Sequence, residues 1–334
     1  PAWVAGAPDD FGGSHGGHGA RHNHSGTPGD VYDSVYRPQL PGGGGSTGSH
    51  LNGGPAGGGV VELIADEVVL DGDLLAAGGA RARAACGGGG TVIVEANRLS
   101  GAGQIDVSGG NSTWHGGPGY MGKGGGGRAA LWVGDLTGFD VDTQVDATAG
   151  VITNGVLAPF AAPGTIFVRD GAATYGYLLV DAGTDADGAV QPSTPTVLPT
   201  LGEGPVVGFE VDGADAWLTR AEPFRPRHLG AYVTLEGAGG AELGTFAVAE
   251  LDEAGRIRLD GAGTVPAADA ASWRGRYLFD DISVRNGAGV DSADPVTGSG
   301  VVLEGDVRVG GDIVAESLLV KAGSRVRPAA GRTS

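Results

Sequence analysis

A repeated pattern of alternating apolar residues and glycines is the feature that most constrains this chain. The first run consists of Val61, Leu63, Ala65, Val68, Leu74, Ala76, Gly78 and Gly79. It recurs 31 positions later as Val92, Val94, Ala96, Leu99, Ile105, Val107, Gly109 and Gly110. A third copy follows, with a small insertion, at Ala129, Leu131, Val133, Leu136, Val145, Ala147 and Gly150. Because side chains alternate across a strand, each unit has an apolar face that only stacking can bury. The repeat therefore predicts an all-β fold, a parallel β-helix or β-solenoid.

Glycine accounts for 68 of the 334 residues, but 40% of the chain is hydrophobic. This composition excludes a disordered linker, and the absence of glycine at every third position excludes collagen. The glycines cluster just before strand runs, at 57–59, 87–90 and 124–127. We expect them to adopt positive φ in tight returns between rungs.

The formal net charge of −18 disfavours binding to nucleic acid or to an anionic membrane surface. The densest apolar run, Val60–Leu75, carries five acidic residues and cannot insert into a bilayer. Cys86 is the single cysteine, which excludes an intrachain disulfide and leaves the redox compartment open. Because the chain starts at Pro1 without a methionine or signal peptide, we expect a processed product or part of something longer.

Changes in composition divide the chain into five segments. They are a Gly-, His- and Pro-rich N-terminal strap (1–56), the glycine-rich β-solenoid repeats (57–183), a linker (184–204), an inserted small antiparallel β-barrel or sandwich (205–283) and C-terminal solenoid rungs (284–334). We expect a degenerate fourth repeat unit at Ile166, Val168, Leu178, Val180 and Gly183. The strap reads as flexible on composition, but Tyr32 and Tyr36 could anchor it along the solenoid or between subunits.

Several segments resemble a known group of proteins. They are GGSHGG at 12–17, YDSVYRPQLPGGGG at 32–45, GGGGTVIVEANRLSGAGQIDVSGGN at 87–111, GGGGRAALWVGDL at 124–136, PGTIFVRDGAATYGYLLVDAG at 163–183, RPRHLGAYVTLEG from Arg225 and RGRYLFDDISVRNGA from Arg274. Together they are similar to the glycine-rich β-helical modules of very large bacterial surface and extracellular proteins. The resemblance implies export, a parallel β-helix and a structural or adhesive role, and it carries no catalytic residues.

Two groups of residues are candidate metal ligands. His15, His18, His22 and His24 lie within ten residues of one another, and neutral imidazoles at such spacing could bind Zn²⁺ or Cu²⁺. Asp181, Asp185 and Asp187 precede Gly188 and could supply oxygen ligands to calcium. The alternatives are histidines that bond to backbone and a solvated acidic turn, so no cofactor is firmly predicted.

The third repeat is preceded by a long loop with Trp114, His115 and Tyr120, which could stack on a sugar ring or on a partner chain. The same side chains could equally cap a neighbouring glycine turn. Asp106 and Asp146 occupy equivalent repeat positions, and a like-charge pair one rung apart could have a raised pKa. Because no catalytic motif accompanies them, we expect that the protein is not an enzyme.

These observations predict an extracellular or cell-surface structural or adhesive module that assembles end to end into a filament. Its partners would be further copies of itself or other domains of a larger surface protein. The alternatives are a β-helix that binds or cleaves carbohydrate on its lateral face and an inert spacer within a giant protein.

Overall fold

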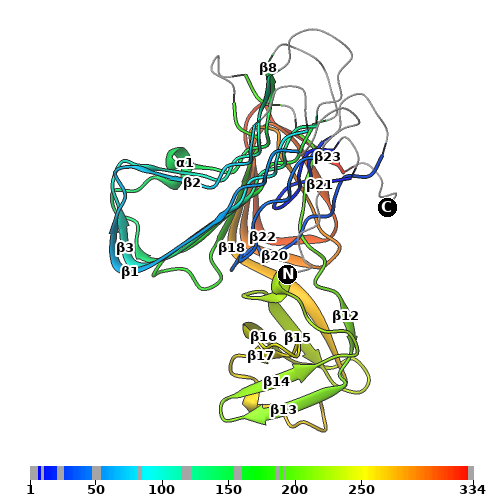
Figure 1. Ribbon diagram of the computed structural model, residues 1–334. Helices are drawn as coiled ribbons and strands as arrows, with labels where there is room; N and C mark the ends of the chain where they lie inside the picture. Colours follow the sequence, from blue (N-terminus) through cyan, green and yellow to red (C-terminus); the bar gives the residue numbers. More distant parts are fainter. Residues whose placement is uncertain are drawn as a thin grey trace.

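The computed structural model describes residues 7–8, 11–20, 26–46, 54–80, 85–113, 122–153, 160–184, 189–191 and 193–329. Within these ranges the chain is built of β-strands, with one α-helical turn and two 3-10 turns. The all-β prediction is confirmed. A 14-stranded mixed sheet runs through the molecule (Figure 1). We call its eight stacked strands, described next, the main sheet.

Four parallel strands form the first half of the main sheet. They are β1 (Val60–Val69), β3 (Thr91–Ser100), β6 (Arg128–Asp135) and β9 (Thr165–Arg169). Val61 pairs with Val92, and Val92 pairs with Ala129, so the repeat frame deduced from the sequence is the observed register. Alternation places every second side chain of these strands in one apolar core.

A second parallel sheet covers this core from one side. It consists of β2 (Asp73–Leu75), β4 (Gln104–Asp106) and β7 (Val145–Asp146), which follows the single turn of α1 (Val141–Gln144). Ile105 and Val145 from this covering sheet pack against Val92, Val94 and Leu131 of the main sheet. Two further short strands, β5 (Ser112–Thr113) and β8 (Ile152–Thr153), pair with each other.

Glycine-rich segments pack side by side next to the first half of the main sheet, and we call them the glycine bundle. It comprises residues 12–17, 42–45, 54–59, 76–79, 86–90, 107–110, 122–127, 147–150 and 161–164. Successive N–H groups of one segment bond to different neighbours. Gly88 donates to Gly43 O at 2.9 Å, Gly89 to Gly125 O at 2.9 Å and Gly90 to Ala76 O at 2.7 Å. Gly87 donates to Gly79 O, and Gly90, three residues later, again donates to the 76–79 segment. This is the periodicity of a polyproline II helix.

The expected reason for these glycines was wrong. No glycine of the bundle is among the described residues with positive φ. A Cβ added at Gly89 would lie 1.9 Å from Val107 O, and one at Gly126 would lie 2.0 Å from Ala147 O. Glycine is required because neighbouring backbones touch, and not because the chain turns.

The predicted fourth repeat unit is also wrong. β9 ends at Arg169, and a turn closed by Asp170 and Gly176 (φ 83°) returns the chain as β10 (Tyr177–Asp181). β10 pairs antiparallel with β9, Leu178 beside Phe167, instead of entering the covering sheet as β2, β4 and β7 do. The strand direction of the main sheet therefore reverses here.

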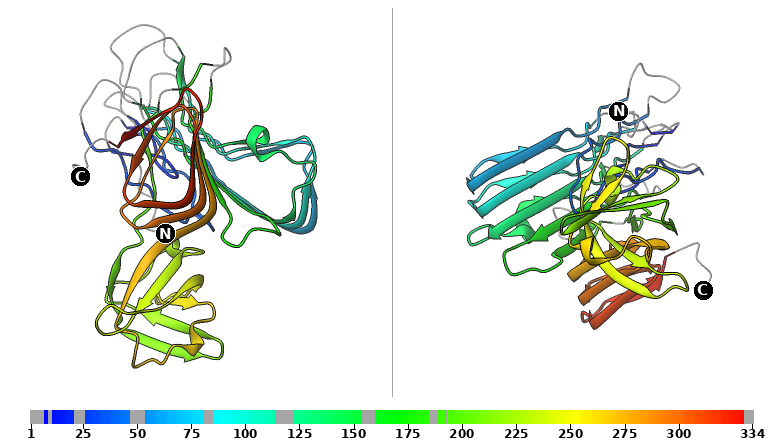
Figure 2. Two further views of the ribbon diagram at one scale, coloured as in Figure 1. Left: turned by 180° about the vertical axis from the view of Figure 1, so that it is seen from behind. Right: turned by 90° about the horizontal axis from the view of Figure 1, so that it is seen from below.

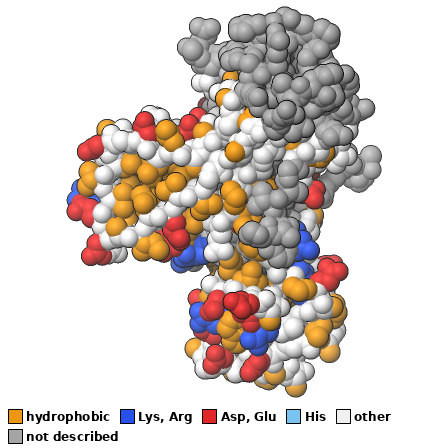
Figure 3. Space-filling model, in the orientation of Figure 1, with side chains coloured by type: hydrophobic (Ala, Val, Ile, Leu, Met, Phe, Trp, Pro, Cys, Tyr) orange, Lys and Arg blue, Asp and Glu red, His pale blue; other side chains and the backbone are white. Residues whose placement is uncertain are grey.

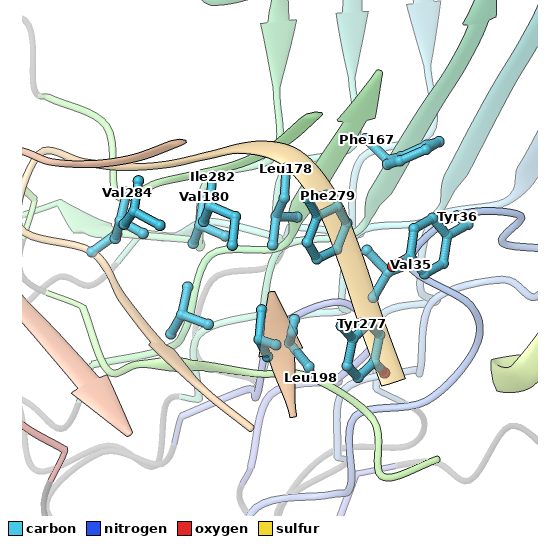
Figure 4. Packing of buried hydrophobic residues seen from close by; sticks show 14 of the residues in the cluster. Val35, Tyr36, Phe167, Leu178, Val180, Leu198, Tyr277, Phe279, Ile282 and Val284 are labelled. Carbon is cyan, nitrogen blue, oxygen red and sulfur yellow. The ribbon is translucent and has the colours of Figure 1, made fainter. Parts of the chain in front are cut away.

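The second half of the main sheet continues from β10 with the opposite strand direction. β18 (Ser272–Arg285), β20 (Val296–Leu303) and β22 (Ile313–Val320) are parallel to β10. Their covering sheet is made of β11 (Thr196–Val197), β19 (Gly289–Asp291), β21 (Asp306–Gly310) and β23 (Arg325–Pro328). It lies on the other face of the main sheet, because Leu178, Val180, Ile282 and Val284 point away from the first core (Figure 4).

The remaining strands are antiparallel and enclose a third apolar core. They are β12 (Glu203–Pro205), β13 (Gly208–Asp212), β14 (Asp215–Thr219), β15 (Tyr232–Glu236), β16 (Glu242–Leu251) and β17 (Ile257–Leu259), with the first part of β18. The 3-10 turns are η1 (Pro226–His228) and η2 (Ala262–Thr264). Trp273 and Phe224 are buried in this core. Figure 2 shows these strands projecting from the stack that runs from β1 to β22.

Candidate assembly faces and lateral groove

The main sheet has two open ends, and β1 forms the first. β1 pairs with β3 along one edge, and its other edge has no strand partner among the described residues. Four large apolar side chains are exposed here: Val60 (44%), Ile64 (72%), Val69 (61%) and Leu75 (65%). Hydrophobic atoms cover much of this end in Figure 3. Residues 54–80 contain five acidic residues and no Lys or Arg.

The second open end is formed by β22 and β23. β22 pairs only with β20 among the described strands. Its exposed apolar side chains are Val314 (60%), Leu318 (63%), Leu319 (55%) and Val320 (41%), with Val326 (47%) on β23. Residues 313–328 contain Lys321, Arg325 and Arg327 but only one acidic residue, Glu316. Lys321 and Arg327 form ion pairs with Glu304 and Asp306 of the preceding layer, at 2.7 and 2.8 Å, so the positive charge of this end is largely neutralised.

A groove lies where the first covering sheet ends. Its main part has a volume of about 480 Å³, and β10, β18, β20 and β22 contribute Leu179, Ile282, Val302 and Leu319 to its largely apolar lining. Arg285 donates to Asp142 Oδ1 at 2.7 Å on its rim. The pKa of Tyr177, which also lines it, is raised by burial and then by the carboxylates of Asp170, Asp280 and Asp281.

A polar recess of about 320 Å³ adjoins this groove and shares Asp142 and Leu179 with it. Asp106 pairs with Asp146 in neighbouring strands, as the repeat predicts, and Asp146 and Asp181 line the recess. Although Asp146 reaches solvent, its pKa is raised, first by partial burial and then by Asp106 and Asp181. The backbone N–H of Thr148 opposes this shift by donating to Asp146 Oδ1 at 2.8 Å.

The two described histidines of the N-terminal cluster bond to the protein itself. His15 is fully buried, and its Nδ1 lies 2.9 Å from Gly89 O in the glycine bundle. Its Nε2 lies 3.5 Å from Asp33 Oδ2. His18 Nδ1 lies 2.8 Å from Gly29 O. His15 therefore has a structural role that the sequence offered only as the alternative to metal binding.

The structure places Tyr32 and Tyr36 within their own chain. Tyr36 is buried among Phe167, Tyr277 and Phe279, so its ring is not available to anchor a second subunit. The Tyr32 hydroxyl donates to Pro41 O at 2.7 Å. Residues 26–46 thus lie against the main sheet on the face opposite the first covering sheet.

A buried polar network fixes this segment, and sequence reasoning missed it. Arg128 is fully buried and donates through Nε and Nη2 to Tyr32 O, both at 3.1 Å. Asp33 (φ 69°) accepts from the backbone N–H groups of Gln39 and Leu40, both at 2.7 Å. Burial lowers the pKa of Arg128, and the nearby Asp33 carboxylate opposes that shift. The available signal was an Arg directly after a glycine run, at the repeat position where the other units have Val60 and Thr91.

The other predicted site residues lie outside the described residues: Trp114, His115, Tyr120, His22, His24, Asp185 and Asp187. Among the residues that are described, no three His, Cys, Asp or Glu side chains form a group that could hold a metal ion. The same residues include no helix long and apolar enough to cross a membrane.

Comparisons of the chain with protein-family models, with curated proteins and with solved structures gave no match.

Proposed function

We propose that this protein is an extracellular structural module, of the kind found in large bacterial surface proteins, whose copies associate end to end. The observation that carries the proposal is the pair of open, apolar ends of one continuous sheet. Unpaired strand edges associate readily unless charge, proline or a covering segment protects them. We interpret the stacked layers as solenoid rungs, for which open ends are the natural sites of association.

The antiparallel pairing of β9 with β10 within the chain resembles the contact that we expect between copies. β1 is parallel to β9, and β22 is parallel to β10, so β1 and β22 run in opposite directions. When β22 of one copy meets β1 of the next, they would pair antiparallel, as β9 and β10 do. The covering sheets on the two sides of this contact would lie on opposite faces of the joined main sheets, as they do on the two sides of the β9–β10 pair. The five acidic residues near the β1 end disfavour contact between two β1 ends and so favour this arrangement.

The test uses two variants that each block one end. Ile64→Lys blocks the β1 end and Leu318→Lys blocks the β22 end, because each places a charge on an exposed apolar position. Val207→Lys is the matched control, since Val207 is 61% exposed between β12 and β13, away from both ends. Sedimentation velocity and negative-stain electron microscopy measure particle size and fibre formation.

Wild type and the control should form concentration-dependent linear particles, and each blocked variant should stay monomeric. An equimolar mixture of the two blocked variants should give dimers and nothing larger, because only one compatible pair of ends remains. A monomeric wild type at high concentration would refute end-to-end self-association. Dimers of Leu318→Lys alone would show contact between two β1 ends instead.

The groove supports a second candidate function, carbohydrate binding on the lateral face. Sugar rings pack on apolar and aromatic surfaces, and carboxylates accept from their hydroxyls. Tyr177 and the acidic rim of the groove offer both kinds of contact. A polysaccharide panel, screened with wild type and Tyr177→Ala, would distinguish this function: binding lost in the variant supports it, and no binding by wild type contradicts it.

A further inference from the structure

Three arginines gather at the base of the antiparallel strands, around Phe224. Arg220 directly follows β14, and Arg225 and Arg227 flank the proline that starts η1. The Arg220 guanidinium carbon lies 4.5 Å from the centroid of the Phe224 ring and 5.3 Å from that of Trp273. The aromatic rings thereby hold one guanidinium in a fixed position.

The three guanidinium groups are close enough to influence one another. The pKa of Arg220 is lowered mainly by burial, then by the positive charge of Arg227 and more weakly by that of Arg225. Burial also lowers the pKa of Arg227, and Arg225 adds to the effect. Concentrated positive charge of this kind stands out in a chain with a net charge of −18.

Neighbouring arginines of the antiparallel strands are neutralised by contact with carboxylates. Arg256 meets Asp252 at 2.7 Å, and Arg258 meets Asp215 at 2.9 Å. Neither Arg220 nor Arg227 has an ion pair within the part of the chain that the structure describes. Their Nε atoms are buried without a hydrogen-bond partner there.

Three carboxylates face the cluster without contacting it: Glu222, Asp30 and Asp294 act on these arginines only through space. Both oxygens of Asp294 are already used, since they accept from the backbone N–H groups of Leu201 and Gly202 at 2.7 and 2.9 Å. Buried donors without acceptors cost stability, and an added acceptor would recover it.

We propose that Arg220, Arg225 and Arg227 form a binding site for a small oxyanion, such as phosphate, sulfate or the carboxylate of a small molecule. The planar donors of arginine match the oxygens of such groups, and charge-assisted hydrogen bonds to them are strong. The net negative charge of the protein repels a long polyanion but hinders a single ion much less. This site is independent of the sheet ends and of the lateral groove.

The test is calorimetric titration of the whole chain with inorganic phosphate and with sulfate, at constant ionic strength. A sulfated polysaccharide is titrated separately to distinguish a free ion from a polymer-borne group. We expect saturable binding of the small ions. The affinity for the polysaccharide, expressed per sulfate group, should not exceed the affinity for free sulfate. Arg227→Gln should weaken binding at least tenfold, whereas Arg256→Gln removes the same charge nearby and should leave it unchanged.

If Arg227→Gln fails to fold, as judged by its thermal unfolding, Arg225→Gln replaces it with the same expected loss. The absence of saturable binding by wild type would overturn the proposal. Equal weakening in Arg256→Gln would also overturn it, because the effect would then reflect overall charge. Much tighter binding of the polymer would reject a small ion as the ligand.

Discussion

The hydroxyl of Tyr36 bridges the backbone of Leu278. It accepts from the Leu278 N–H and donates to the Leu278 carbonyl oxygen, both at 3.0 Å, across 242 residues of chain. One side chain of the N-terminal segment thereby satisfies both polar groups of a residue in β18. The contact joins the N-terminal segment to β18, which belongs both to the main sheet and to the antiparallel strands.

Replacing Tyr36 with phenylalanine should destabilise the protein by about 1–3 kcal/mol, because the Leu278 backbone groups lose their partner. Tyr32→Phe is the matched control. Its hydroxyl bonds to Pro41 O at an exposed position, where water can replace it, so we expect a loss below about 1 kcal/mol. Urea unfolding followed by circular dichroism measures both. Equal losses in the two variants would contradict a special role for Tyr36.

Alanine at Gly89 should destabilise the fold by about 3 kcal/mol or more, since its Cβ would meet the Val107 carbonyl oxygen. Gly59 provides the control, because a Cβ there meets nothing within 4 Å and its φ is not positive. Gly59→Ala should change the free energy of unfolding by less than about 1 kcal/mol. If Gly89→Ala unfolds like wild type, backbone contact does not explain the glycines.

The stability of the protein should depend on His228 between about pH 6.5 and pH 4. Burial lowers the pKa of His228 to about 4 from its ordinary 6.5, with Arg220 and Arg227 contributing. In this window the unfolded chain takes up a proton that the folded chain does not, so stability falls as the pH falls. The loss attributable to His228 approaches about 3 kcal/mol at pH 4.

Unfolding measurements from pH 8 to pH 4 on wild type and His228→Gln test this dependence. His228 Nε2 lies 2.9 Å from Leu201 O, and the glutamine amide can still donate there. The variant should therefore lose part of the pH dependence within the window. Parallel stability curves for both proteins would show that other groups are responsible.

Asp146→Asn should stabilise the protein at neutral pH. The pKa of Asp146 is raised, so its ionised form is disfavoured in the folded state at pH values above that pKa. Asparagine keeps the acceptor for the Thr148 N–H and removes the charge. The gain in melting temperature should shrink as the pH falls and the wild-type carboxyl takes up its proton. A gain of the same size at every pH would contradict this cause.

The sequence allowed the stacking frame to be predicted, because matched apolar positions such as Val61 and Val92 recur at constant spacing. The reversal after β9 could not be predicted in this way. The alternating apolar pattern at Leu178 and Val180 is the same whether the strand enters a covering sheet or returns beside β9. The outcome depends on long-range contacts, such as the acceptance of the Tyr175 and Gly176 N–H groups by Asp280.

The candidate sites were harder to predict than the fold. Arg128 contacts Tyr32 across 96 residues, and no local pattern marks such a pair. The spacing of His15 and His18 suggested metal ligands, because it shows that the imidazoles are close in sequence. It does not show that each imidazole lies within hydrogen-bond distance of a backbone carbonyl oxygen. The repeat predicts a sheet with open ends, but the exposure of Ile64 and Leu318 can be recognised only once the last strand in each direction is known.

The glycine bundle also bears on how relatives of this protein should look. At glycines such as Gly89 and Gly126 an added Cβ would meet a neighbouring carbonyl oxygen, so substitution there is excluded, whereas the apolar residues of the cores can exchange for others of similar volume. Insertions can accumulate in the loops that connect its segments. Over evolutionary time the spacing of short glycine runs should therefore persist longer than the identity of the hydrophobic residues, and would be the better signal for finding distant relatives.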